Sequence, residues 1–185
     1  NKDWLSRLKG LVDTVQISVD GSTPAVHDKI RNCKGSFAMA EEAIRLCRKY
    51  DFKVSVRTTL MSLNLQDVPA IIDLLPKWGV RLFGIRRILP QGKALTAWDE
   101  LSPSPEEYIN ELRLIKDKLS KIEPKIYFWG GDPIINIICF EKSVFRATTS
   151  KVQDMKAYFK DPKNRFKWYS GCAAGVSYIY IAANG

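Results

Sequence analysis

Val15-Gln16-Ile17-Ser18-Val19-Asp20-Gly21 alternates apolar and polar residues and ends at a glycine. Successive side chains of a β-strand point to opposite faces, so positions 15, 17 and 19 would face one side and positions 16, 18 and 20 the other. The segment therefore predicts a strand with an apolar back and a polar front. Such a strand packs one face on helices and keeps the other face available for polar contacts.

Further strands and helices follow this segment in alternation. The periodicity predicts strands over residues 53–60, 80–89 and 125–129, and helices that begin near Ser36, Asn64 and Ser104. The start of the last helix is marked by Pro105 with acidic residues after it. The predicted buried stripes are Phe37, Ala40, Ile44 and Cys47 on the first helix and Val68, Ile71, Ile72 and Leu75 on the second. Strand–helix repeats predict parallel strands joined by right-handed crossovers.

The polar front of the first two strands favours a barrel over an open sheet. Ser55, Arg57 and Thr59 alternate with apolar residues in the second strand, as Ser18 does in the first. Strands of a doubly wound open sheet are buried on both faces and read as continuous apolar runs. A barrel whose interior holds a ligand can keep one polar face on each strand. The expected fold class is therefore α/β, with helices outside a barrel-like parallel sheet.

Composition limits the classes of function. Hydrophobic residues make up 45% of the chain, as in ordinary soluble globular proteins, and no apolar run is long enough to span a membrane. The net charge of +9 would suit an anionic partner, but the lysines have the spacing of solvated helix faces and no nucleic-acid-binding motif accompanies them. A nucleic-acid partner is therefore not expected.

The cysteines are widely separated. Cys33, Cys47, Cys139 and Cys172 form no CxxC pair, and His27 is the single histidine, so a protein-only zinc site and a disulfide framework are not expected. This usage fits a reducing, cytoplasmic setting. Cys47 and Cys139 are interpreted as core residues, with a remote ligand role left open for Cys139.

Several stretches, in order, resemble the radical S-adenosylmethionine (SAM) enzymes that carry a C-terminal SPASM or twitch extension. The matching stretches are Ile17–Gly21 (fourth barrel strand), His27–Arg31 with Ser36-Phe37, Arg57–Asn64 (fifth strand), Leu89–Lys93 (end of the sixth strand), and Gly171–Gly175 with Ile179–Gly185 (opening of the extension). The resemblance implies a partial TIM-type (β/α)6 barrel. Residues 1–140 would form the C-terminal part of that barrel, and residues 141–185 a linker and the beginning of the extension.

The chain lacks the CxxxCxxC motif whose thiolates hold the family's [4Fe–4S] cluster, and it lacks an early Gly-Gly-Glu-Pro stretch. It begins without methionine and ends with Asn184-Gly185, a hairpin turn with no strand after it. We therefore expect a piece of a longer protein, with the cluster ligands outside this chain. The isolated chain is expected to be inactive.

The resemblance implies SAM as a cofactor, and its chemistry selects candidate contacts. Ser18 would act as a hydroxyl donor, Arg57 could form a planar fork for the carboxylate, and Thr59 points the same way. Arg31, placed in a loop after the first strand, is a further cofactor-binding candidate, although pairing with Asp20 or Asp28 is left open. Arg57 could equally hold a neighbouring acid. No catalytic residue is assigned.

Cys172 is the candidate metal ligand. It stands in Gly171–Gly175, a run of small residues that matches the first cysteine ligand of an auxiliary iron–sulfur cluster. The implied activity is reductive cleavage of SAM to a 5′-deoxyadenosyl radical that modifies a peptide, a protein or a tetrapyrrole. An electron donor such as flavodoxin or ferredoxin would be a partner. The alternative is a non-catalytic basic α/β module that binds an anionic partner.

Overall fold

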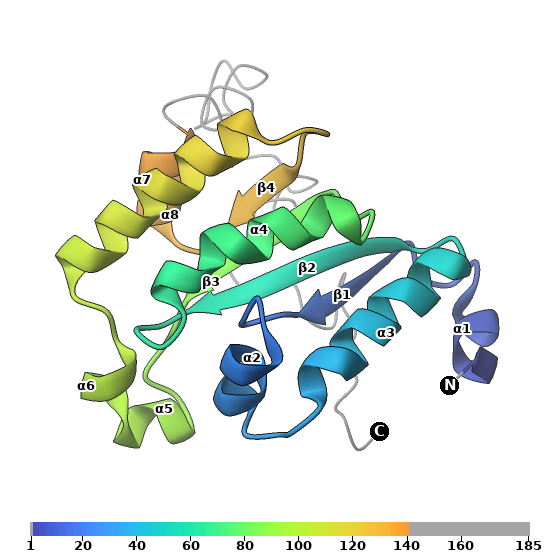
Figure 1. The fold of residues 1–185 in the computed structure, drawn as a ribbon, viewed down its shortest axis with the longest axis horizontal. Coiled ribbons are helices and arrows are strands. Elements are labelled where there is room, and N and C mark those ends of the chain that lie inside the picture. Colours follow the sequence, from blue (N-terminus) through green and yellow to red (C-terminus); the bar gives the residue numbers. More distant parts are fainter. Residues whose placement is uncertain (1, 141–185) are drawn as a thin grey trace, which may run out of the picture. The chain divides into compact units, whose positions relative to one another are not determined.

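The structure, a computed structural model, describes the backbone of residues 2–140. It also describes their side chains, except those of residues 2–4, 133, 136, 137 and 140. Strands and helices alternate along this part of the chain (Figure 1). The elements are α1 (Lys2–Leu8), β1 (Thr14–Ser18), α2 (Pro24–Arg31), α3 (Ser36–Lys49), β2 (Lys53–Leu60), the 3-10 turn η1 (Leu65–Asp67), α4 (Val68–Lys77), β3 (Leu82–Arg87), α5 (Lys93–Thr96), α6 (Trp98–Leu101), α7 (Pro105–Lys121), β4 (Tyr127–Gly130) and α8 (Pro133–Phe140).

The strands form one parallel sheet in the order β1-β2-β3-β4. Each strand pairs with the next along the chain, and helices connect them. This confirms the predicted α/β class with parallel strands and outer helices. Because the pairing follows chain order without a reversal, the sheet grows in one direction only, as it does around a barrel wall.

One face of the sheet carries the hydrophobic core. Val56, Phe83 and Ile85 are fully buried there, and helices α3 and α4 lie along this side (Figure 1). The predicted stripes are confirmed, with Ala40 half-buried against the core and the others buried: Phe37, Ile44 and Cys47 of α3 and Val68, Ile71, Ile72 and Leu75 of α4. The sheet and its helices therefore form two layers around a common apolar interface.

The opposite face is called here the polar face, after Gln16, Ser18, Ser55, Arg57, Thr59 and Arg86, which alternate with the core residues. The register places Ser18 beside Arg57, Arg57 beside Gly84, and Gly84 beside Trp129. Side chains in one row of a parallel sheet point to the same side. The polar front expected from the first two strands thus borders Gly84 and Trp129 on the next two strands.

Helix α2 occupies a segment that the sequence did not predict as helical. Thr23 caps it by accepting a hydrogen bond from the backbone N–H of Val26, and Pro24 stands at its first position. Asn32, with φ of 48°, ends it in the left-handed conformation. The placement of Arg31 in a loop was therefore wrong, because Arg31 is the last residue of this helix.

Helices α7 and α3 are capped at their N-termini by different kinds of residues. Helix α7 begins with the predicted cap: the Ser104 hydroxyl accepts from Glu107 N, and the Glu107 carboxylate accepts from Ser104 N. Helix α3 begins differently. Gly35 takes its cap position, and the carboxylate of Asp28 accepts hydrogen bonds from Gly35 N, Ser36 Oγ and Phe37 N.

The serines and prolines of residues 98–105 predict a loop, but this segment is partly helical, because α6 spans Trp98–Leu101. The expected linker and extension over residues 141–185 lie outside the described residues. Within residues 2–140, no helix combines the length and the apolar composition needed to cross a membrane.

We expect Ile72→Ala to lower the free energy of unfolding by about 2–5 kcal/mol, because Ile72 of α4 is fully buried in the hydrophobic core and its truncation leaves a cavity. Urea denaturation would measure this. Leu114→Ala on α7 is the matched control, since Leu114 is 57% exposed, and it should change the value by less than about 0.5 kcal/mol. Equal effects of the two substitutions would contradict the assigned core.

Candidate functional site

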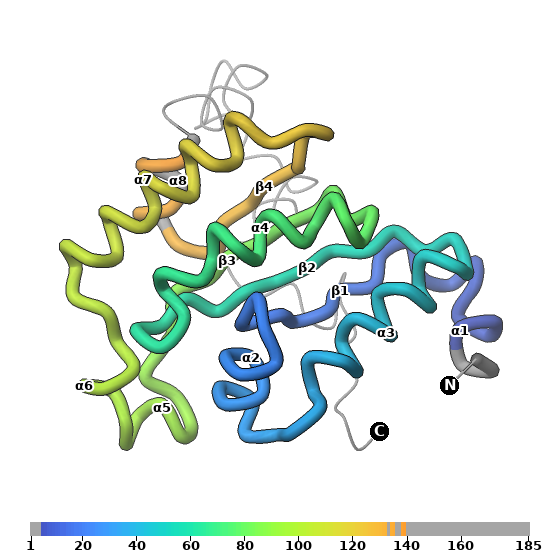
Figure 2. Tube along the Cα trace, viewed as in Figure 1, coloured from blue at the N-terminus to red at the C-terminus, as the bar shows by residue number. Residues whose placement is uncertain are grey.

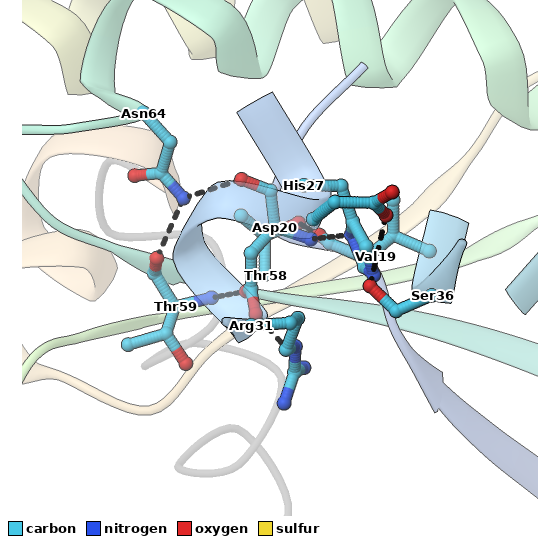
Figure 3. Close-up of polar contacts among 9 residues, drawn as sticks. Val19, Asp20, His27, Arg31, Ser36, Thr58, Thr59 and Asn64 are labelled. Atoms are coloured by element: carbon cyan, nitrogen blue, oxygen red, sulfur yellow. Dashed lines mark hydrogen bonds and ion pairs between the residues drawn. The ribbon is translucent and has the colours of Figure 1, made fainter. Parts of the chain in front are cut away.

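The carboxyl ends of β1 and β2 are joined through Asp20, whose side chain is buried (Figure 3). Its Oδ1 accepts a hydrogen bond from the backbone N–H of Thr59 at 2.8 Å, and its Oδ2 lies 2.8 Å from Nη2 of Arg31. A buried carboxylate is stable only when it is paired in this way. One side chain therefore links the end of β1, the end of β2 and the last turn of α2.

Asn64 completes this junction from the turn after β2. Its Nδ2 donates to the carbonyl oxygens of Asp20 and Thr59, both at 2.9 Å, and its Oδ1 accepts from Met61 N at 3.0 Å. Thr58 adds a hydrogen bond from Oγ1 to the carbonyl oxygen of Val19 at 2.6 Å. These contacts fix the spacing of the two strand ends.

Helix α2 follows β1 closely in the trace of Figure 2, and Gly21 stands in the connection between them. A Cβ atom at Gly21 would lie 2.4 Å from the backbone nitrogen of His27, so only glycine fits there. His27 is buried, and its Nδ1 accepts a hydrogen bond from Asp20 N at 3.0 Å. Nδ1 is therefore unprotonated. Burial is the main cause that lowers the pKa of His27, opposed by the nearby Asp20 carboxylate.

The row Ser18–Arg57–Gly84–Trp129 crosses the polar face beside this junction. Ser18 is exposed and Arg57 is half-buried. The guanidinium carbon of Arg57 lies 5.2 Å from the centroid of the Trp129 ring. Thr59, half-buried, follows in the next row on this face, beside Arg86.

The structure brings Ser18, Arg57 and Thr59 together, as the sequence predicted, on neighbouring strands of one face. Arg31 takes one of the two alternatives left open, since it pairs with Asp20. Cys172 lies outside the described residues. The cofactor and metal roles of these residues stay predictions.

Sequence reasoning missed three contributors to the site. Asp20 was named as part of the strand's polar front and as one of two alternative partners of Arg31, but its role in holding the strand ends together was not predicted. Trp129 lay in a predicted strand without a role, and Gly84 was not singled out. A glycine within a strand often marks the close approach of another group, and this was the available signal for Gly84.

The residues of the polar face fit SAM but provide no cluster site. A hydroxyl, a guanidinium fork and an indole surface match the polar and apolar groups of that cofactor. In the part of the chain that the structure describes, no three His, Cys, Asp or Glu side chains lie close enough to hold a metal ion.

The described thiols near the core are also poor ligands. Burial raises the pKa of the Cys139 thiol to about 11 and also raises that of Cys47, which disfavours the thiolate needed for iron. Cys139 packs against the core, as interpreted from the sequence.

Comparison with known proteins supports the resemblance seen in the sequence. Residues 1–75 match the profile of the Radical SAM superfamily. This chain belongs to the radical SAM superfamily. The matched segment contains β1, β2 and the Asp20 junction, whereas Gly84 and Trp129 lie outside it. Membership of this superfamily implies SAM and a [4Fe–4S] cluster.

Curated relatives include an AdoMet-dependent heme synthase from Methanosarcina barkeri, 29% identical over 62% of this chain and 32% of that protein. The mycofactocin maturase MftC of Mycobacterium ulcerans is 36% identical over 51% of this chain and 26% of that protein. An Fe-coproporphyrin III synthase of M. barkeri is 30% identical over 68% of this chain and 31% of that protein. These alignments span about a quarter to a third of the length of the relatives.

The fold is similar to that of anSMEcpe, solved with bound AdoMet and a Kp18Cys peptide. The TM-score is 0.58 at 16% identity, over 69% of this chain and 37% of that one. This match to a radical SAM partial barrel confirms the barrel expected over an open sheet.

We expect Asp20→Ala to lower the free energy of unfolding by about 1–3 kcal/mol, because Thr59 N–H would lose its acceptor in a half-buried position. Asp20→Asn keeps an acceptor oxygen and should cost less. Urea denaturation measures both. Asp13→Ala, an exposed aspartate before the same strand, should stay within about 0.5 kcal/mol. A cost for Asp20→Ala no larger than this control would contradict the junction.

We expect stability to fall as the pH drops below about 6.5, the unfolded pKa of histidine. Burial lowers the pKa of His27 in the folded protein. As the pH falls, the unfolded chain therefore binds a proton at this histidine before the folded protein does. The free energy of unfolding decreases between the unfolded and the folded pKa of His27. The free energy of unfolding, measured from pH 7 to pH 5, should decline more steeply for the wild type than for His27→Gln, which cannot titrate. Parallel profiles would show that His27 makes no such contribution.

Proposed function

We propose that this chain is part of a radical SAM enzyme and that its polar face forms the wall that binds SAM. The observation that carries the proposal is the row joining Ser18 and Arg57 beside the Asp20 junction, at the carboxyl ends of the strands. Active sites of TIM-type barrels lie at this end. The junction supports pre-organisation, because it fixes the strands that carry both side chains.

Each side chain has a distinct part in this proposal. The Arg57 guanidinium binds the carboxylate of SAM as a planar fork, and the hydroxyls of Ser18 and Thr59 hydrogen-bond its other polar groups. Arg31 is 39% exposed and keeps further N–H donors beyond its contact with Asp20. It acts at the edge of the site, where its exposed part makes a second interaction with the cofactor.

Bound SAM and a reduced [4Fe–4S] cluster supply reductive cleavage to methionine and a 5′-deoxyadenosyl radical, which takes a hydrogen atom from the substrate. The spacing of the four cysteines provides no CxxxCxxC motif, so the cluster ligands come from outside this chain. Cys172 ligates an auxiliary iron–sulfur cluster. The part played by the described residues is to bind SAM and hold it in one orientation. The isolated chain is without turnover.

The substrate is a peptide, a protein or a tetrapyrrole. A heme synthase and a mycofactocin maturase among the relatives, and the peptide bound to anSMEcpe, support these classes. A flavodoxin or ferredoxin supplies the electron. The cytoplasmic setting expected from the cysteines belongs to the same proposal.

The alternative of a basic module that binds an anionic partner has less support. Several basic side chains pair with acids on the helical exterior, including Arg45 with Glu42 and Lys118 with Asp73. Such pairs neutralise part of the positive charge on the surface. Anaerobic reconstitution with iron and sulfide of the enzyme that includes this chain separates the two functions. The proposal requires a [4Fe–4S] chromophore, and its absence would favour the alternative.

We expect Arg57→Met to weaken SAM binding by about 10- to 100-fold, the loss typical of a charge-assisted hydrogen-bonded pair. Equilibrium binding of SAM to the cluster-containing enzyme, with 5′-deoxyadenosine formation as a second readout, measures the effect. Arg45→Met is the matched control, because Arg45 lies on the exposed side of α3 in an ion pair with Glu42. Equal affinities of the two variants would contradict the role of Arg57.

A further inference from the structure

We propose that Trp129 is a positioning residue for Arg57. Residue 84 is glycine because the indole ring of Trp129 must cross this position to reach Arg57. In this arrangement the ring holds the guanidinium on the polar face in the orientation that binds the carboxylate of SAM. The inference rests on the proposed function, since it assigns to Arg57 the carboxylate contact described above.

The first observation is the register. Arg57, Gly84 and Trp129 stand side by side on β2, β3 and β4, so Arg57 and Trp129 are separated by one intervening strand. Neighbouring strands are about 4.8 Å apart, which puts the two backbones roughly 10 Å from each other. The side chains nevertheless meet, with the guanidinium carbon 5.2 Å from the ring centroid. They meet across the position of Gly84.

The second observation is the space above Gly84. A Cβ atom there would lie 2.3 Å from Cε2 and Cζ2 of Trp129, closer than real Cβ atoms come to other atoms. Gly84 is not among the glycines with positive φ, so its backbone conformation does not require glycine. The requirement is room for the ring. A glycine in a strand interior is otherwise unfavourable, and the position of the ring gives it a physical reason.

The third observation is the geometry of the contact. A guanidinium group stacks through its flat face, whereas its N–H donors point outward in the plane. Contact with the indole uses the flat face of the group and not the N–H donors, which are the atoms that bind a carboxylate. It also restricts a long, flexible side chain, which lowers the entropy lost when SAM binds.

Phe128, which precedes Trp129 in β4, shows that the contact between Trp129 and Arg57 is not part of the hydrophobic core. Phe128 points to the other face of β4, where its ring lies 5.9 Å from that of Phe83 in the core. Trp129 is half-buried on the polar face. Two adjacent aromatic residues of one strand thus serve different environments, which provides a matched control.

The experiment compares two ligands in the cluster-containing enzyme that includes this chain. SAM carries the carboxylate, and 5′-methylthioadenosine lacks the whole amino-acid portion. Trp129→Leu should weaken SAM binding by about 3- to 30-fold, the range of a cation–π contact, and should change 5′-methylthioadenosine binding by less than about twofold. Trp129→Phe, which keeps an aromatic face, should retain most of the affinity. Phe128→Leu should lower the free energy of unfolding without changing the ratio of the two affinities.

Arg57→Met in the same assay distinguishes failure of this inference from failure of the proposed function. In the Arg57→Met background, Trp129→Leu should cause no further loss of SAM affinity, because the positioned group is gone. If Arg57→Met lowers the affinity ratio and Trp129→Leu does not, the positioning role is overturned while the function stands. If Arg57→Met leaves the ratio unchanged, the carboxylate contact itself is wrong.

If Trp129→Leu lowered the affinities for SAM and for 5′-methylthioadenosine equally, the ring would contribute to binding of the whole ligand. This result would also overturn the positioning role. Should Trp129→Leu fail to fold, Trp129→Met removes the aromatic face with an unbranched side chain, and the same outcomes apply. Gly84→Ala provides an independent test, because its methyl group would displace the ring. It should weaken SAM binding and spare 5′-methylthioadenosine.

Discussion

The buried carboxylate of Asp20 is the constraint on which the described site depends. A charge in this position needs partners, and it finds them in the backbone of Thr59 and the guanidinium of Arg31. Asn64 satisfies the remaining carbonyl groups of the two strand ends. The arrangement cannot slip by one residue without leaving several buried polar groups unpaired. The register of β1 and β2 is fixed at the end where the candidate site lies.

A fixed register has a chemical consequence on the polar face. It sets Ser18 and Arg57 side by side, and the pairing with β3 and β4 brings Gly84 and Trp129 into the same row. The core on the opposite face holds this row from behind through fully buried residues such as Val56 and Ile85. Rigid packing behind a polar row is the arrangement that a small charged ligand requires, because the binding groups are oriented before it arrives.

Local patterns predicted most of the elements because their physical causes are local. Alternation specified the faces of β1 and β2, and helical periodicity specified the buried stripes of α3 and α4. The start of α7 was predictable because its cap, Ser104, and its partner Glu107 are three residues apart. The short helix α2 was not predicted, because a helix of about two turns shows little periodicity in its sequence. Only Thr23 and Pro24 indicated where it starts.

The sequence by itself determined the α/β class, the parallel order of the strands and the polar character of one face. It did so because alternation, caps and apolar stripes act over a few residues. Tertiary structure alone decided which polar residues meet. Asp28 caps α3 across a turn, Asp20 pairs with Arg31 one helix away, and Trp129 reaches Arg57 over Gly84. These contacts depend on strand register and chain reversal, which no short stretch of sequence specifies.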